Sequence, residues 1–308
     1  MAKTRPESDS IGTLEVPAEA YYGVQTLRGL QNFHITGNPM DKRFYRNIVR
    51  IKKAAALTNR EAGLLDDRMC NAITAACDEA LEGQLDAWFI TDAIQGGAGT
   101  TANMNVNEVI ANRATELLGG KKGEYLCHPN DHVNCSQSTN DVIPTAGRLT
   151  VIGLAEELFR NTQALTDALD GKARQFNDVI KMGRTQLEDA VPMRLGQSFH
   201  AYATMIERDI RRIERARKEL FTLNLGGTAI GTTINASDYY LHHIVPTLME
   251  DAEQQGAPFL MLGVCENNLA LLDEAMPGYF YATADRDFTD YIYHREVLAT
   301  LSGKKLQP

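Results

Sequence analysis

The sequence predicts a mainly α-helical protein in which an N-terminal helical domain is followed by part of a long-helix bundle. Three observations support this fold class. Apolar residues recur at steps of three and four through several long segments. No proline interrupts the interval from Thr145 to Phe176. No segment sustains the alternation of apolar and polar residues that predicts a sheet, and no internal repeat is evident.

The first part of the chain predicts an extended lead-in followed by three helices. Residues 1–40 are rich in glycine, proline and asparagine, which favours irregular, extended chain. Helical spacing of apolar residues then predicts helices over residues 42–61, 69–85 and 105–118. Gly119 and Gly120 follow the third helix and are expected to end it, because glycine readily adopts the left-handed conformation after a helix.

Two long amphipathic helices are predicted next, over residues 145–176 and 194–223. In the second, apolar residues form a seam typical of a helical bundle, which other helices or other chains must cover. The charged stretch that begins at Glu207, ERDIRRIERARKE, is interpreted as a solvated face, with an interaction surface as the alternative. The seam consists of Phe199, Tyr202, Ile206, Ile210, Ile213 and Leu220.

Three divisions of the chain are expected. The N-terminal helical domain covers residues 1–140, and the long-helix bundle segment covers residues 141–236. After Ala236 the chain mixes aromatic residues, prolines and glycines, so the helical seam is lost until short stretches near Asn268 and Tyr293. The segment 237–308 therefore stays unassigned.

Composition limits the kinds of partner that the chain is expected to bind and the compartment in which it is expected to lie. The chain has 308 residues, a formal net charge of −9 and no block dense in lysine and arginine, which argues against a nucleic-acid or anionic-membrane surface. The N-terminus lacks the apolar core of a signal peptide, and no apolar run is long enough to span a membrane, so we expect a cytoplasmic protein. Five cysteines, an odd number, fit reduced thiols better than a disulfide framework. The expected partner is a small molecule or another protein chain.

Three polar segments of similar composition carry the candidate chemistry. Each is expected to lie just before a helix, where unpaired backbone N–H groups and the helix dipole favour an anion. Neither GxxxxGK[ST] nor GxGxxG occurs in them, so nucleotide binding has little support. The alternative is that each segment is only a capping loop. The segments are QGGAGTTANMN (95–105), HPNDHVNCSQSTND (128–141) and GRTQLEDA (183–190).

A zinc site is the rival interpretation of the second segment. Cys127, His128, His132 and Cys135 are residues that bind zinc, but the two adjacent ligands Cys127 and His128 strain the tetrahedral geometry that a structural zinc prefers. No CxxC or HExxH occurs elsewhere in the chain. We therefore expect no metal.

Taken together, these blocks resemble the aspartase/fumarase superfamily of lyases over about residues 4–236. The resemblance rests on RPESDSIGTLEVPAEAYYGVQTLRGLQNF, GTTANMNVNEVIANRA, HPNDHVNCSQSTND, KMGRTQLEDAVPMRLGQ and NLGGTAIGT, which stand in the family's order. YYGVQT, the tripeptide Ser138-Thr139-Asn140 and Gln186 are similar to the aspartate-specific ammonia-lyases, since fumarases typically carry histidine at the last position. HPND is similar to the fumarases, where it forms a secondary anion site.

The resemblance implies a reaction without a cofactor. Removal of the β-proton of L-aspartate gives an aci-carboxylate with two negative charges on one group, which fixed neutral donors must surround. Ammonia then leaves and fumarate results. By resemblance, Thr100, Ser138, Thr139, Thr185 and Gln186 hold the β-carboxylate and Asn140 contacts the amino group. His128, Asn130 and Asp131 are either a secondary anion site or an ordinary turn.

The sequence also departs from the family. The loop that carries the catalytic serine, a Gly-Ser-Ser run leading into Met-Pro, is not found, and the end LSGKKLQP (301–308) is interpreted as a coincidence. The catalytic base is therefore unassigned. Family members are longer and form homotetramers whose active sites combine three subunits, so we expect a homo-oligomer. Two alternatives stay open, namely a catalytically silent or truncated member that binds a dicarboxylate or partner chains, and a fumarate hydratase.

Overall fold

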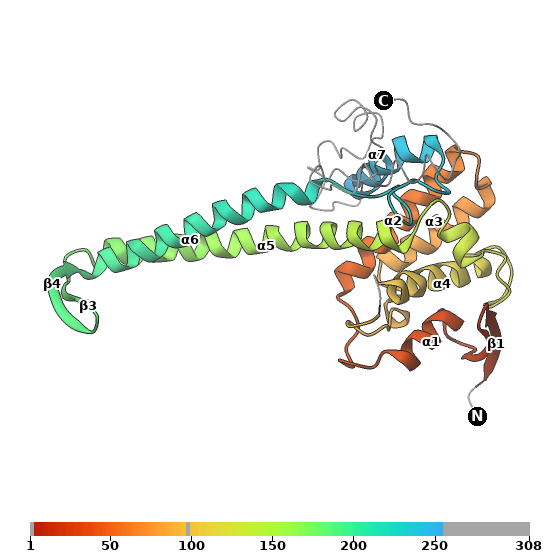
Figure 1. The fold of residues 1–308 in the computed structure, drawn as a ribbon, viewed down its shortest axis with the longest axis horizontal. Coiled ribbons are helices and arrows are strands. Elements are labelled where there is room, and N and C mark those ends of the chain that lie inside the picture. The colour runs from red at the N-terminus through yellow and green to blue at the C-terminus, as the bar shows by residue number, and fades with distance from the viewer. Residues whose placement is uncertain (1–2, 97–98, 255–308) are drawn as a thin grey trace, which may run out of the picture. The chain divides into compact units, whose positions relative to one another are not determined.

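The computed structural model describes residues 3–96 and 99–254, which divide into two compact units. Among the described residues, the first unit contains 3–96, 99–150 and 222–254. The second unit is Val151–Phe221. Figure 1 traces both units.

The first unit is a cluster of helices with a small hairpin. Helix α2 packs against α3, α4 and α7, and α1 packs against α4. Apolar side chains from α2, α3, α4 and α7, among them Ile48, Ile73, Ile110 and Ile244, are fully buried and form its core. The elements are β1 (Thr4–Asp9), β2 (Gly12–Pro17), α1 (Val24–Asn32), α2 (Lys42–Glu61), α3 (Asp67–Leu81), η1 (Asp86–Trp88), α4 (Thr100–Leu117), η2 (Pro129–Val133), α7 (Asp238–Gln254) and the first turns of α5 (Thr139–Gln175).

The second unit is a helical hairpin with a β-hairpin between its helices. The greater part of α5 runs beside α6 (Leu195–Lys218), and the antiparallel strands β3 (Ile180–Thr185) and β4 (Glu188–Arg194) join them (Figure 1). The rings of Phe176 and Phe199 stack with centroids 5.7 Å apart, and Arg217 pairs with Glu156. A short 3₁₀ turn, η3 (Glu219–Phe221), follows α6.

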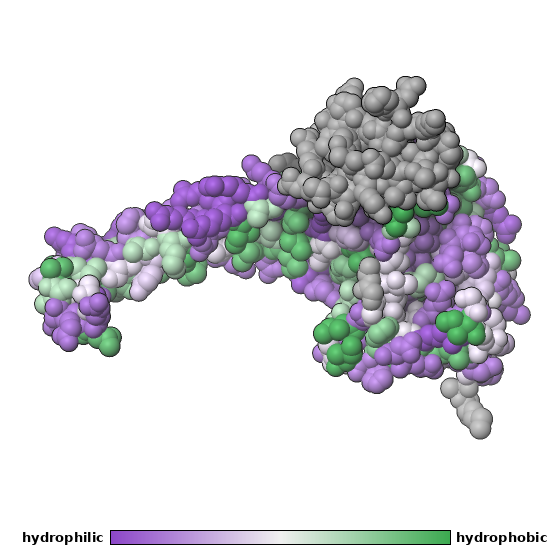
Figure 2. Space-filling model, viewed as in Figure 1, coloured by the Kyte–Doolittle hydropathy of each residue, from purple (hydrophilic) through white to green (hydrophobic). Residues whose placement is uncertain are grey.

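The predicted seam of α6 is only partly covered within this unit. Tyr202 is 54% exposed and Ile213 is 39% exposed. Figure 2 shows a hydrophilic strip along α6, where the predicted solvated face lies, and hydrophobic patches beside it. Two helices alone cannot enclose a bundle seam, so apolar side chains stay at the surface.

The mainly α-helical fold is confirmed, and α2 has the predicted bounds. The predicted starts of α4 and α5 were five and six residues late, at Asn105 and Thr145. Apolar spacing cannot locate a start made of hydroxyl and amide residues. Gly119 adopts φ +91°, and its amide and that of Gly120 donate to carbonyls of the last turn of α4, so the predicted end is confirmed.

Pro144 lies inside α5 and hid the true start of that helix. Proline cannot donate to the carbonyl four residues earlier, which belongs to Asn140. Asn224 Nδ2 donates to that carbonyl instead, at 3.0 Å. A side chain from a distant loop thus completes the first turns of α5.

Other expectations need correction. The lead-in contains the β1–β2 hairpin and helix α1, and the GRTQLEDA segment forms the end of β3, the turn at Gln186 and Leu187 and the start of β4 rather than a helix start. Loss of helix after Ala236 was wrong for Asp238–Gln254, because Pro246 inside α7 disguised its pattern. The stretches near Asn268 and Tyr293 and the end 301–308 lie outside the described residues. The predicted divisions at 140 and 236 stay predictions.

The described residues bear on two predictions, that the cysteines are reduced and that no helix spans a membrane. Its four cysteines, Cys70, Cys77, Cys127 and Cys135, are all free thiols. None of the helices that the structure describes combines the length and apolar character needed to cross a membrane.

Candidate active site

The starts of α4 and α5 meet in the first unit and bring four of the predicted donors together. Gly99 precedes Thr100 with φ +88°, and a Cβ at Gly99 would lie only 3.0 Å from the Ile143 side chain. Asn103 Nδ2 on α4 donates to Thr139 Oγ1 on α5 at 3.2 Å. Glycine at position 99 therefore permits a close approach of the two helix starts.

Residues 138–140, which we call the donor turn, are held in a tight local arrangement. The Ser138 amide donates to Asp141 Oδ1 at 3.0 Å, and the Asn140 amide donates to Ser138 Oγ at 3.3 Å. Ser138 and Thr139 are half-buried, while Asn140 and Thr100 are exposed. Hydroxyl groups from two helix starts thus lie on one region of the first unit.

Asp141 ties the glycine-rich block NLGGTAIGT to the donor turn. Its Oδ2 accepts from the amides of Gly226 at 3.1 Å and Thr228 at 2.9 Å. Asn140 Nδ2 donates to the Ala229 carbonyl at 2.7 Å. Burial raises the pKa of Asp141, and the three amides together with Lys52 oppose that effect.

Gln95 from the first polar segment caps α4. Its Oε1 accepts from the Ala102 amide at 2.7 Å, so one of the N–H groups at this helix start is already engaged. The capping interpretation is thus correct for Gln95. Thr100, the first residue of α4, remains exposed beside it.

Lys52 lies fully buried in the same region and was missed by the sequence analysis. Its Nζ donates to Asn134 Oδ1 at 2.8 Å and to Gln137 Oε1 at 3.0 Å. Burial lowers the pKa of Lys52 to about 7, while Asp141 favours its charged form. Lys52 stands on the apolar stripe of α2 between Ile48 and Ala55, a placement that permits burial but does not require it.

Thr185 and Gln186 belong to the second unit, whereas the other four predicted donors belong to the first. Thr185 ends β3 and pairs with Glu188, so Gln186 and Leu187 form a two-residue turn. Both turn residues have positive φ, +52° and +67°, a conformation that β-hairpin turns require and that favours glycine and asparagine. The side chains of Thr185 and Gln186 are exposed.

The HPND segment forms a tight turn at η2. His128 Nδ1 accepts from the Asp131 amide at 3.2 Å and lies 3.1 Å from the Asp131 carboxylate, while Asn130 is exposed. Burial raises the pKa of the nearby Cys127 thiol to about 12. Across the described residues, no three His, Cys, Asp or Glu side chains gather as a metal site would need.

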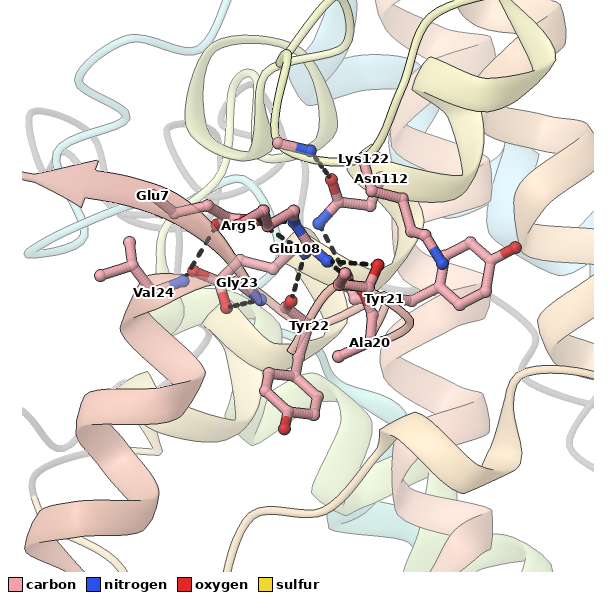
Figure 3. A network of polar contacts seen from close by, with 12 residues as sticks. Arg5, Glu7, Ala20, Tyr21, Tyr22, Gly23, Val24, Glu108, Asn112 and Lys122 are labelled. Carbon is pink, nitrogen blue, oxygen red and sulfur yellow. Dashed lines mark hydrogen bonds and ion pairs between the residues drawn. The ribbon is translucent and has the colours of Figure 1, made fainter. Parts of the chain in front are cut away.

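The YYGVQT segment is anchored by a buried carboxylate that the sequence analysis also missed. Glu108 on α4 accepts from the amides of Gly23 and Thr26, at 2.9 and 3.0 Å, and thereby caps α1 (Figure 3). Arg5 donates to the carbonyls of Pro17, Ala18, Ala20 and Tyr22. Burial raises the pKa of Glu108, and the Thr26 hydroxyl and the amides of Thr26, Gln25 and Gly23 oppose that rise. The network fastens the N-terminal segment to the helix that carries Thr100.

Comparison with known proteins identifies relatives over most of the chain. Residues 12–261 match a family described as Lyase, beyond the end at 236 that the resemblance suggested. An aspartate ammonia-lyase of Helicobacter pylori is 48% identical over 278 residues, covering 89% of this chain and 58% of the relative. A class II fumarate hydratase of Halobacterium salinarum is 50% identical over 232 residues, covering 75% of this chain and 49% of the relative.

Solved structures give the same picture. A fumarate lyase:delta crystallin from Brucella melitensis superposes with a TM-score of 0.78 at 45% identity, covering 82% of this chain and 55% of that chain. A class II fumarase from Schistosoma mansoni superposes with a TM-score of 0.77 at 36% identity, covering 82% and 54%. The chain spans about half the length of the proteins that it matches.

Proposed function

The chain belongs to the Lyase family, within the aspartase/fumarase superfamily, and from that premise we propose that it acts as an aspartate ammonia-lyase. It converts L-aspartate to fumarate and ammonia by abstraction of the β-proton through an aci-carboxylate. No cofactor is required. The aspartate ammonia-lyases of Helicobacter pylori and of Bacillus subtilis, 48% and 47% identical to this chain, support the choice of substrate.

The observation that carries the proposal is the meeting of two helix starts that are rich in neutral donors. A carboxylate that gains a second negative charge in the reaction is stabilised by donors that are already in place. Ser138 and Thr139 lie at the start of α5, and Thr100 begins α4. Because the N-termini of helices also favour anions, both features point to the same ligand class, a small dicarboxylate.

The roles of the individual residues follow from the same chemistry. We assign Thr100, Ser138, Thr139, Thr185 and Gln186 to the β-carboxylate and Asn140 to the departing amino group. The base that removes the β-proton stays unassigned. His128, Asn130 and Asp131 form a secondary anion site in this proposal, which their compact turn and partial exposure permit.

A homotetramer in the cytoplasm completes the proposal. The uncovered seam of the second unit, with Tyr202 and Ile213 at the surface, supports association with further copies. Helices of neighbouring copies would cover these side chains, as the other helices of a complete bundle would.

The test is the formation of fumarate from L-aspartate, followed by ultraviolet absorbance on a sample whose oligomeric mass is recorded. Thr139→Val removes one hydroxyl at constant size and is expected to lower the rate by about 10²-fold. Thr74→Val is the control, because the Thr74 hydroxyl bonds only within α3. Heat stabilisation by succinate without fumarate formation would indicate a silent dicarboxylate binder. Absence of both effects would contradict the proposal.

Fumarate hydratase is the second candidate, favoured by the Halobacterium relative and the HPND turn. The two activities differ in the group that leaves the α-carbon. Gln186→His is expected to shift preference from aspartate toward malate, and Leu187→His, at the neighbouring turn position, is the control. Activity of the unaltered chain on malate but not on aspartate would favour the hydratase.

A further inference from the structure

Lys52 begins a chain of hydrogen bonds that ends at a predicted donor. Its Nζ donates to Asn134 Oδ1 at 2.8 Å. The same oxygen accepts from Asn103 Nδ2 at 3.2 Å, and Asn103 Nδ2 also donates to Thr139 Oγ1 at 3.2 Å. Lys52 is 0% exposed and Asn103 is 1% exposed, so this series of hydrogen bonds lies inside the first unit.

The chemistry of these groups fixes the direction of every bond. Below about pH 7 the folded protein holds Lys52 as an ammonium, which has three donors and no acceptor, so only amide oxygens can face it. Asn134 Oδ1 can then only accept, and Asn103 must turn its NH₂ group toward it. That orientation places the Asn103 NH₂ against Thr139 Oγ1. The Thr139 oxygen therefore accepts, and its own proton is left to donate elsewhere.

Several features of this arrangement do not favour stability. The lysine is fully desolvated, which opposes its charge. The Oδ1 atoms of Asn103 and Asn107 are buried and have no hydrogen-bond partner among the described residues. Buried polar atoms without partners lower stability, and native proteins keep few of them. Asn107 Nδ2 also donates to Asn134 Oδ1, at 3.2 Å, so both oxygens without partners belong to the network that ends at Thr139. Keeping these unfavourable features in one network indicates that the arrangement serves binding.

We propose that Lys52 is a positioning residue that, through Asn134 and Asn103, makes the Thr139 hydroxyl a donor to a substrate carboxylate. The inference rests on the proposed function, in which Thr139 holds a carboxylate. Lys52 does not touch the substrate. Its effect is to select one of the two directions in which the hydrogen bonds could run.

The neighbouring lysine offers a matched control. Lys53 Nζ pairs with Asp78 at 2.8 Å and with Asp251 at 2.6 Å, and so links α2 to α3 and α7. Neither partner belongs to the donor turn. Loss of Lys53 removes a favourable charge from the largely buried Asp251, which is destabilising.

The experiment compares Lys52→Met, Lys53→Met and Asn103→Asp in urea unfolding and in calorimetric titration with succinate, both below pH 7, where folded Lys52 is protonated. Lys52→Met is expected to unfold at an unchanged or higher urea concentration but to bind succinate at least about tenfold more weakly. Lys53→Met is expected to unfold at lower urea and keep its affinity within about twofold. Asn103→Asp, whose carboxylate would accept the Thr139 proton, is expected to weaken binding as Lys52→Met does.

The outcomes separate this inference from the proposed function. If wild-type protein binds succinate and Lys52→Met binds it equally well, the positioning role is overturned. If the wild-type protein binds no succinate, the proposed function fails, and hydrogen exchange of the amides of residues 138–141 then decides about Lys52. Faster exchange in Lys52→Met than in Lys53→Met supports the positioning role, and equal exchange overturns it.

Discussion

At the scale of single residues, Lys52 makes the stability of the protein depend on pH. Its pKa falls from 10.5 to about 7 on burial. Between these values the unfolded chain holds the proton and the folded chain does not, so the free energy of unfolding rises with pH, by up to about 1.4 kcal/mol per pH unit. Below about pH 7 both states are protonated and this dependence ends.

Lys52→Met is expected to remove that slope. We predict that the difference in unfolding free energy between wild type and variant changes with pH only from about pH 7 to about pH 10. Urea titrations of both proteins at several pH values measure it, and Asp141 and Cys77, the charged or ionisable groups that act on Lys52, are present in both. A constant difference across this range would contradict the burial of a neutral lysine.

Unlike Lys52, whose burial does not favour stability, the buried Glu108 is expected to stabilise the fold. Its carboxylate accepts from Gly23, Gln25 and Thr26, and Glu108→Gln replaces one accepting oxygen by an NH₂ that faces N–H donors. We expect a loss of about 1–3 kcal/mol in unfolding free energy, measured by urea denaturation. Exposed Glu15→Gln is the control, and a similar small change in both would refute the capping role of Glu108.

At the scale of elements, sequence spacing located α2 to α6 but missed α1 and α7, and it placed the starts of α4 and α5 too late. The apolar stripe of α2 predicted both of its ends, whereas Thr100 and Thr139 begin helices without any apolar signal. The donor residues were predicted because their blocks resemble a known family, not because spacing places them together. Lys52 was missed because a lysine on an apolar stripe is indistinguishable in sequence from one that reaches solvent with its end.

The start of α5 supplies a prediction about Pro144 and Asn224. Asn224→Ala removes the donor to the Asn140 carbonyl and is expected to lose about 1 kcal/mol. In a Pro144→Ala background, the new backbone N–H can bond that carbonyl, so the same substitution should lose less, by about 0.5 kcal/mol or more. A double-mutant cycle in urea measures the coupling. Strict additivity would mean that Asn224 does not replace the bond that proline lacks.

The β3–β4 turn supplies a second prediction at this scale. Leu187 has φ +67° and is 95% exposed, so its side chain gains little from burial while the left-handed conformation is unfavourable. Leu187→Gly is expected to stabilise the hairpin by about 0.5–1 kcal/mol, seen as slower amide exchange in β3 and β4. Glu188→Gly, at a paired strand position, should instead accelerate exchange. Equal effects of both glycines would exclude strain at Leu187.

At the scale of the whole molecule, the exposed apolar side chains and the proposed function both favour association of several copies of the chain. The second unit exposes apolar side chains on both of its helices, including Leu158 and Leu165 on α5 and Tyr202 and Met205 on α6, each about half exposed. A monomeric protein rarely keeps so many large apolar groups on one small unit. The predicted donors are likewise divided, with four in the first unit and Thr185 and Gln186 in the second.

Self-association through these side chains yields the last prediction. Leu165→Glu adds a charge at an exposed position, so the unit itself should still fold, but an interface that buries Leu165 would have to desolvate an unpaired carboxylate. We expect light scattering to give a smaller mass for the variant than for wild type at the same concentration. Arg211→Gln, which changes the net charge by the same amount on the hydrophilic strip of α6, should keep the wild-type mass. An unchanged mass for Leu165→Glu would show that α5 does not form the interface. A smaller oligomeric mass in both variants would mean that the change in net charge causes the dissociation. The two positions differ in that only Leu165 is an apolar side chain that an interface could bury.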